Sequence, residues 1–294
     1  MNGVTIFFVL SGYLITRNLL ERNLSLRGFY IRRYFRLMPV VWCYLLFLLL
    51  LQSVYRYPND LTAGSLSALL CYNNFAPGGP ATGHFWSLSI EEQFYLVWPA
   101  LLVLCGRRKG LWLAIGGALA VATYRFANWQ YFHQVKTAGL TQARADALLV
   151  GCALALVLDR PKLRQAGDRI LPALWPYALG YLAYCIMCFH MLSRLSECIA
   201  IAVLIGASVV RPKSSLARGL SVSPLVWAGS ISYSAYVWQQ LFIPVIRTNY
   251  SLWNVVLMAI FSLASYYAIE QPMRRFGRRL EARLASRKLV GVAG

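Results

Sequence analysis

Long apolar runs separated by short basic tracts constrain the fold of this chain more than any other feature. Of its 294 residues, 59% are hydrophobic and only 13% are charged, whereas a soluble domain is usually about 45–50% apolar. Most of the runs approach the roughly twenty residues that a helix needs to cross a bilayer. The alternating pattern of a membrane β-barrel does not occur. The sequence therefore predicts an all-α fold, a polytopic bundle of transmembrane helices.

About nine segments qualify as membrane spans. When these spans are placed alternately up and down across a membrane, the basic residues fall mostly on one side. Of the 29 Lys and Arg residues, 23 then fall on one side and 6 on the other. Cytoplasmic loops carry such an excess of positive charge. We therefore expect a multi-pass inner-membrane protein with a cytoplasmic C-terminus. The expected spans are 3–20, 38–55, 84–104, 111–127, 143–158, 170–189, 193–210, 226–246 and 252–270.

Charge and cysteine placement exclude several other classes of protein. A net charge of +19 would suit nucleic-acid binding. The basic residues lie in short tracts between apolar runs, however, so no nucleic-acid partner is expected. The seven cysteines and three histidines show no ligand or disulfide framework, and we expect no metal and no bound cofactor.

Residues 1–276 are expected to form one transmembrane domain, and residues 277–294 a basic tail on membrane lipid. The Gly- and Pro-rich loop at about 56–83 predicts turns rather than helix.

The segment from His84 to Tyr95 is the most informative motif. It places Glu91 and Glu92 at the outer end of a span, and ionisable groups within a membrane are costly and usually functional. In a functional interpretation, one glutamate orders a polar site or a basic partner. The alternative is an ordinary helix start, with a serine cap and glutamates in the first turn.

The segment from Tyr30 to Pro39 carries Arg33 and Arg36, which share a helix face because they are three residues apart. Arginine forks suit phosphate, and this site is predicted to face the cytoplasm. The phosphates of a nucleotide-bearing donor such as a coenzyme A thioester would be bound there. The alternative is a topology signal that binds lipid headgroups.

Two charged motifs lie at the ends of spans. Asp146 follows Arg144 at the start of the span at 143–158, where a structural ion pair is one interpretation and a functional group the other. Glu270 ends the last span beside Arg274 and Arg275, where an ion pair at the inner surface is the favoured role.

The segment from Gly229 to Gln240 is polar for a membrane span. Ser232, Tyr236 and Gln239 (or Gln240) would face one cavity if they act together. Hydrogen bonds between helices explain them equally well.

Together with the segment Gly3-Val4-Thr5-Ile6-Phe7-Phe8-Val9-Leu10-Ser11-Gly12-Tyr13-Leu14-Ile15, these motifs resemble the acyltransferase-3 family. The family pattern reads G-x-x-x-F-F-V-L-S-G-[FY]-L, R-R-x-x-R-[IL]-x-P, W-S-L-x-x-E-x-x-F, R-x-D-[AG], S-Y-x-x-Y and E-x-P-x-R, and the chain matches all six in order over residues 3–275. Each motif is modest by itself, but the ordered set is specific.

The resemblance implies a membrane enzyme that moves an acyl group, usually acetyl, from cytoplasmic acyl-CoA to a carbohydrate or glycolipid hydroxyl. It places Arg33 and Arg36 on the coenzyme A phosphates, with Ser11 and Tyr13 near the path of the thioester. Glu91 would act in positioning rather than as a base, and it would order the polar centre with Asp146.

The chain departs from the family pattern in two ways. The family's first helix carries an Arg and, about eleven residues later, a His held to be essential, and neither has a counterpart here. We expect from this that a helix preceding Met1 is missing; the alternative is a protein with its N-terminus outside whose first helix inserts unaided. Gln239 stands where many members have His, and His84 is the remaining candidate for a substitute base.

The leading hypothesis is a carbohydrate O-acyltransferase. Transfer to a sugar hydroxyl needs a base near the nucleophilic oxygen and donors for the developing oxyanion. A membrane transporter or flippase of glycan or acyl substrates is the alternative from another class, although no repeated half is visible. A catalytically inactive, truncated copy is the third interpretation.

Overall fold

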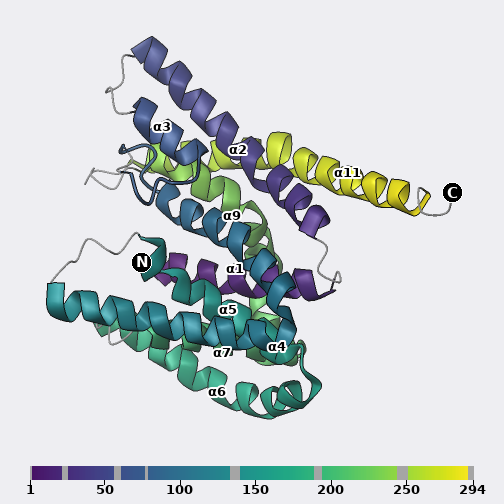
Figure 1. Cartoon of the computed structure of the whole chain (residues 1–294). Coiled ribbons are helices and arrows are strands. Elements are labelled where there is room, and N and C mark those ends of the chain that lie inside the picture. Colours follow the sequence, from purple (N-terminus) through teal and green to yellow (C-terminus); the bar gives the residue numbers. More distant parts are fainter. Residues whose placement is uncertain are drawn as a thin grey trace. The chain divides into compact units, whose positions relative to one another are not determined.

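The chain folds into helices that group into two compact units. The computed structural model describes residues 2–21, 26–55, 61–76, 79–132, 140–188, 194–243 and 251–290, and every regular element in these ranges is a helix (Figure 1). Unit 1 comprises Met1–Leu24 and Ile90–Val222, and unit 2 comprises Ser25–Ser89 and Ser223–Gly294. The predicted all-α class is confirmed. The single domain over 1–276 with a tail at 277–294 stays a prediction.

Unit 1 is built on two helix pairs, α1 with α5 and α6 with α7, and α7 also contacts α1 and α5. Its apolar core at one end includes Tyr13, Ala155 and Leu158, with partly buried Leu, Ile and Val side chains against them. The helices of this unit are α1 (Asn2–Glu21), α4 (Phe85–Phe132, in this unit from Ile90), η2 (Thr141–Ala143), α5 (Ala145–Leu158), α6 (Pro161–Cys188), α7 (Arg194–Val210) and α8 (Ser215–Leu220).

Unit 2 has a core of aromatic and branched side chains. Tyr44 and Trp238 are buried at its centre, with their ring centroids 5.3 Å apart in an edge-on arrangement, which suits aromatic pairs. The helices of this unit are α2 (Leu26–Tyr55), α3 (Leu61–Leu69), α9 (Ser223–Phe242), α10 (Leu252–Ser265), the π-helical η3 (Tyr266–Glu270) and α11 (Gln271–Val290).

A single glycine separates two of the expected spans. Gly106 has φ 70° and ψ 173° within α4, a conformation that is essentially open only to glycine. The helix is kinked at this residue, and the two parts of α4 run in different directions (Figure 1). These parts correspond to the predicted spans at 84–104 and 111–127.

Where they are described, all nine expected segments are helical apart from single residues near their ends, such as His84 and Arg144, which lie in turns. By length and composition, five stretches of the described chain can cross a membrane, and α4 counts once among them although Gly106 divides it. Large apolar side chains such as Leu50, Val54, Leu104 and Trp112 are exposed, which lipid explains and water does not. The chain is a multi-pass membrane protein, and the number nine stays a prediction.

The loop expected at 56–83 contains a helix. Helix α3 occupies Leu61–Leu69, so the expectation of turns alone is wrong for that part. Turns follow it, and two buried hydrogen bonds hold them, from Asn73 Nδ2 to Ser67 Oγ at 2.9 Å and from Tyr44 Oη to the Ala81 carbonyl oxygen at 2.6 Å. Residues 56–60, 77 and 78 lie outside the described ranges.

Charged residues in unit 1 meet partners from the same predicted side of the membrane. On the side assigned to the cytoplasm, Arg107 lies 2.9 Å from Asp159 and donates to the Leu20 carbonyl oxygen. On the opposite side, Arg125 lies 2.8 Å from Asp146. The contacts therefore agree with the loop alternation predicted from the sequence.

Candidate active site

Helices α1 and α5 approach each other so closely that two glycines are required. A Cβ on Gly12 would lie 1.9 Å from the carbonyl oxygen of Leu148, and one on Gly151 would lie 2.0 Å from that of Val9. The Cys152 thiol also donates to the Gly12 carbonyl oxygen at 3.4 Å. Small residues permit this approach between membrane helices. Gly12 and Gly151 therefore fix the position of α1, which carries Ser11.

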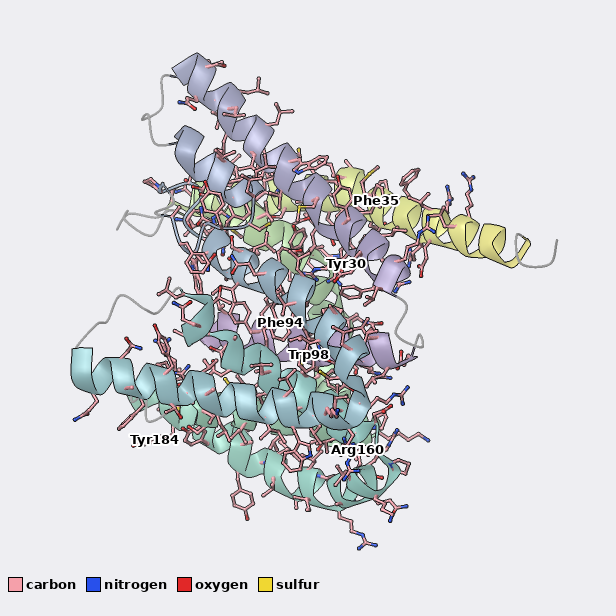
Figure 2. The ribbon with its side chains drawn as sticks, in the orientation of Figure 1. Tyr30, Phe35, Phe94, Trp98, Arg160 and Tyr184 are labelled. Carbon is pink, nitrogen blue, oxygen red and sulfur yellow. The ribbon has the colours of Figure 1, made fainter. Side chains whose placement is uncertain are left out.

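Glu91 is the centre of a buried hydrogen-bonded group. The residue is 2% exposed, and its Oε1 accepts a hydrogen bond from Ser11 Oγ and another, at 2.5 Å, from Tyr95 Oη. About two turns after Glu91 along α4, Trp98 Nε1 donates to Thr16 Oγ1 on α1 at 2.9 Å, and Figure 2 labels this tryptophan. Two hydrogen bonds between side chains thus join α1 to α4.

The hydroxyl donors explain how a carboxyl group is tolerated in a membrane helix. A buried acid is costly unless it is hydrogen-bonded. Tyr95 follows Glu91 by four residues and therefore lies on the same face of α4, whereas Ser11 arrives through the packing of α1. The arrangement fixes the orientation of two hydroxyl groups, which is what a positioning residue does.

Asp146 pairs with an arginine that is distant in sequence. Its Oδ2 lies 2.8 Å from Arg125 Nη1, which also donates to the Ala143 carbonyl oxygen at 3.0 Å. Arg125 on α4 is therefore an ion-pair partner of Asp146 that the neighbouring Arg144 did not indicate. Arg144 is buried in the turn before α5, so this end of unit 1 holds more than one arginine.

Arg33 and Arg36 both lie on α2 in unit 2. Between them and the helix start, Arg32 forms an ion pair with Glu281 of α11. Arg36 is exposed and lies near enough to Glu270 to attract it electrostatically. The role of Arg33 and Arg36 in donor binding stays a prediction.

Glu270 is buried, with 1% of its surface exposed. Ser234 Oγ donates to its Oε2 at 2.8 Å, and Arg274 lies 3.5 Å from Oε1, which agrees with the expected ion pair. Glu270 ends the π-helical η3, two residues before Pro272. A proline ring clashes with the carbonyl group four residues earlier, and a wider π turn relieves this clash.

His84 is held within unit 2. Its Nε2 lies 3.1 Å from the Val237 carbonyl oxygen, so this nitrogen carries the proton and Nδ1 the lone pair. The ring packs on Phe85, Tyr44 and Tyr236, which fits a structural role better than that of a substitute base. Within the described ranges, no group of three or more His, Cys, Asp or Glu residues could hold a metal ion.

The polar residues of α9 have different partners. Tyr236 Oη donates to the His84 carbonyl oxygen and contacts Ser87 Oγ, whereas Ser232 is exposed and donates back to the Gly229 carbonyl oxygen at 2.8 Å. The common cavity expected for Ser232 with Tyr236 and Gln239 is therefore not seen in the described part of the chain. Gln240 donates to the Pro80 carbonyl oxygen.

Comparison with known proteins identifies the family. The Acyltransferase domain family, acyltransferase-3, matches residues 1–269. The chain belongs to this family. It is similar to "Putative peptidoglycan O-acetyltransferase YrhL" of Bacillus subtilis (strain 168) and to "Peptidoglycan O-acetyltransferase OatA" of Listeria monocytogenes, each 32% identical over 94% of the chain. A "Putative O-acetyltransferase" of Staphylococcus aureus (strain COL) is 28% identical over 94% of it. No solved structure matches.

The chain spans about half the length of these relatives, with 51–53% of each covered. The predicted acyltransferase-3 family is confirmed, and the predicted enzyme class, an O-acyltransferase, is confirmed at the level of the family. The acyl group, the donor and the acceptor are not decided by the match.

Several residues of this acyltransferase-3 chain were not predicted as part of its polar centres. Tyr95 lies one turn after Glu91, so helical spacing would have indicated it. Arg125 had no such signal because its partner is 21 residues away along the chain. Ser234 lies within the predicted motif of α9, yet the sequence could not indicate that it, rather than Ser232, faces Glu270.

Proposed function

We propose that this chain is a membrane O-acyltransferase that moves an acyl group, most simply acetyl, from acyl-CoA to a hydroxyl of a cell-surface or lipid-linked carbohydrate. The observation that supports this proposal is the buried Glu91 with its two hydroxyl donors in a chain of the acyltransferase-3 family. Two of the similar proteins are named peptidoglycan O-acetyltransferases. Glycan of the peptidoglycan type is therefore the acceptor to test first.

The chemistry assigns positioning to this group. Acyl transfer to a sugar oxygen needs reactants held in register, and a displacement of about 1 Å can cost roughly 100-fold in rate. Glu91 fixes Ser11 and Tyr95 by accepting from both. Because the single proton of each hydroxyl group points to Glu91, its oxygen lone pairs are left to accept a hydrogen bond from the sugar hydroxyl and hold it in place. In this role Glu91 stays the acceptor of both bonds and does not act as the base.

The test measures transfer of radiolabelled acetyl from acetyl-CoA to glycan in membranes that contain the chain, with Glu91→Gln as the variant. An amide keeps the size of the side chain but makes a weaker acceptor, and we expect transfer to fall roughly 100-fold. Glu92→Gln is the matched control, since it makes the same change one residue further along α4, and it should keep near wild-type transfer. Equal transfer by Glu91→Gln and the wild-type chain would contradict the proposal. Movement of glycan without acetyl transfer would indicate a transporter instead.

A further inference from the structure

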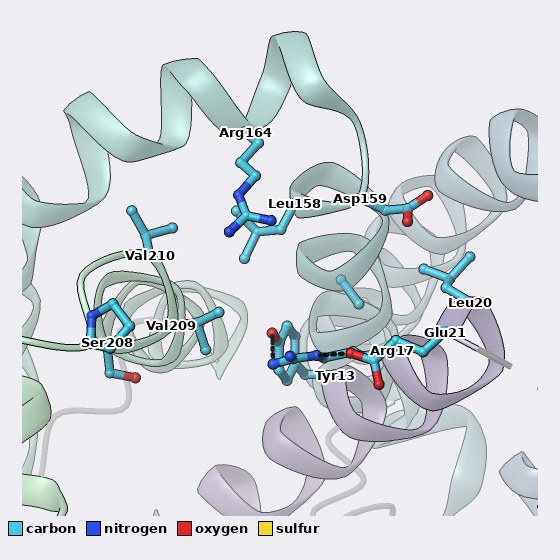
Figure 3. Close-up of a pocket in the computed structure, with 12 residues that line it drawn as sticks. Tyr13, Arg17, Leu20, Glu21, Leu158, Asp159, Arg164, Ser208, Val209 and Val210 are labelled. Carbon is cyan, nitrogen blue, oxygen red and sulfur yellow. Dashed lines mark hydrogen bonds and ion pairs between the residues drawn. The ribbon is translucent and has the colours of Figure 1, made fainter.

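A cavity of about 530 Å³ lies within unit 1, at the end where α1 and α5 finish and α6 begins (Figure 3). Four helices and two connecting residues contribute to its wall. Its lining combines charged and apolar side chains and consists of Tyr13, Arg17, Leu20, Glu21, Ala155, Leu158, Asp159, Arg164, Ser208, Val209, Val210 and Pro212.

The cavity is at the predicted cytoplasmic end of unit 1. Asp159 in its wall pairs with Arg107, which also donates to the carbonyl oxygen of Leu20. The described loops and helix ends on this side of unit 1 carry eleven Lys and Arg residues. They carry only three acidic residues, Glu21, Asp159 and Asp168. A cleft with apolar walls concentrates such a positive field and attracts anions.

Two arginines give the cavity a cationic side. Arg17 donates from Nε to Glu21 Oε1 at 2.7 Å and from Nη1 to Tyr13 Oη at 3.2 Å. Arg164 extends from α6 toward the cavity (Figure 3), and its guanidinium forms no ion pair with any described residue. Both acids of the lining are already bound by an arginine, Glu21 by Arg17 and Asp159 by Arg107. An incoming anion would therefore meet the Arg164 guanidinium without competition from a bound carboxylate.

The remaining wall is apolar and leads toward the motif of α1. Leu158, Val209 and Val210 line it, and the Tyr13 ring, 3% exposed, closes it. Tyr13 lies two residues after Ser11, which is about 3 Å along the helix axis. The cavity thus reaches close to the membrane depth of the Ser11–Glu91 bond.

From this combination we infer that the cavity binds the acyl donor, with phosphate groups at Arg164 and Arg17 and the slender acylated arm along the apolar wall. This inference rests on the proposed function and deepens it, because it assigns acyl-CoA to residues of unit 1, whereas the family resemblance assigned the donor to Arg33 and Arg36 of unit 2. An anionic phospholipid shares the chemistry of a phosphate joined to an apolar chain, and the experiment must separate the two sources.

The experiment measures binding of acetyl-CoA to the purified full chain in nanodiscs. Arg164→Ala should weaken binding roughly tenfold, and Arg164→Glu should weaken it more, because a charge-assisted contact to phosphate is lost or reversed. Arg169→Glu is the matched control, an exposed arginine on the same helix that does not line the cavity, and it should bind acetyl-CoA like the wild-type chain. Equal effects of the Arg164 and Arg169 charge reversals would overturn the inference.

Two further arms separate the remaining outcomes. Binding is repeated in nanodiscs of phosphatidylcholine alone and with phosphatidylglycerol added; if Arg164→Glu releases phosphatidylglycerol but leaves acetyl-CoA affinity unchanged, the occupant is lipid and the inference fails. If Arg33→Ala and Arg36→Ala abolish acetyl-CoA binding while Arg164→Glu does not, the donor site lies elsewhere and the proposed function stands. If the wild-type chain and all variants fail to bind acetyl-CoA, the proposed function itself fails. It also fails if acetyl-CoA binds but its acetyl group is not transferred.

Discussion

At the scale of single residues, Glu91 shows how a membrane helix keeps an acid. Both of its identified donors, Ser11 and Tyr95, reach the same oxygen, Oε1. Hydrogen bonds between membrane helices contribute only about 0.6–2 kcal/mol each. A shared acceptor makes the two bonds dependent on each other, because the loss of one donor lets the carboxyl group shift toward the other.

This dependence predicts non-additive effects of Ser11→Ala and Tyr95→Phe. Each change removes one hydroxyl group, and each should lower stability by about 0.6–2 kcal/mol. The double variant should differ from the sum of the two by at least about 0.5 kcal/mol. Unfolding of the purified protein by denaturant in mixed micelles provides the four free energies. Strict additivity would show that the two hydroxyl groups do not act on one carboxyl oxygen.

At the scale of helices, α1 and α5 are in direct contact through their backbones. Gly12 and Gly151 allow this approach, since a Cβ at either position would overlap a carbonyl oxygen of the other helix. Flexible side chains can move aside, but helix carbonyl groups cannot move without breaking the helix. The contact is therefore sensitive to the addition of one methyl group.

We predict that Gly151→Ala lowers the free energy of unfolding by at least about 1–3 kcal/mol, the usual cost of overpacking. Gly180→Ala on α6 is the control, because nothing lies within 4 Å of the Cβ that it would add. Thermal denaturation in detergent, followed by size-exclusion chromatography, measures both variants. Equal decreases in melting temperature for the two variants would contradict the claim that Gly151 is needed for the close packing of α1 on α5.

Apolar length predicted the helices, but it could not predict local geometry or partners. A single apolar run can satisfy its own backbone groups in a membrane only as a helix, so the described parts of the nine segments are helical apart from single residues near their ends. Helix α3 was missed because its nine residues are short for an autonomous helix. A structural ion pair was one of two interpretations of Asp146 beside Arg144, and sequence proximity gives no sign of the partner Arg125 on another helix. Glu91 and Ser11 were both predicted as site residues, but only packing brings them into contact.

At the scale of the whole molecule, the basic residues and the apolar spans together assign each loop to one of two predicted sides of the membrane. Contacts within unit 1 join residues of the same predicted side, Arg107 with Asp159 on one and Arg125 with Asp146 on the other. In unit 2, Arg32 and Glu281 join two segments assigned to the basic side. In the proposed reaction the donor is cytoplasmic acyl-CoA, so the orientation of the chain decides whether the donor can reach its basic side.

Cysteine labelling tests this orientation. In a chain that keeps only Cys71, a thiol reagent that cannot cross membranes should label intact cells, because this residue lies in the turns that follow α3 on the predicted outer side. In a chain with Arg108→Cys as its single cysteine, the same reagent should label only permeabilised cells, since the exposed Arg108 lies at the basic turn of α4 beside Gly106. Labelling of the Arg108→Cys chain in intact cells would place the cavity and its arginines outside, where no cytoplasmic thioester could reach them.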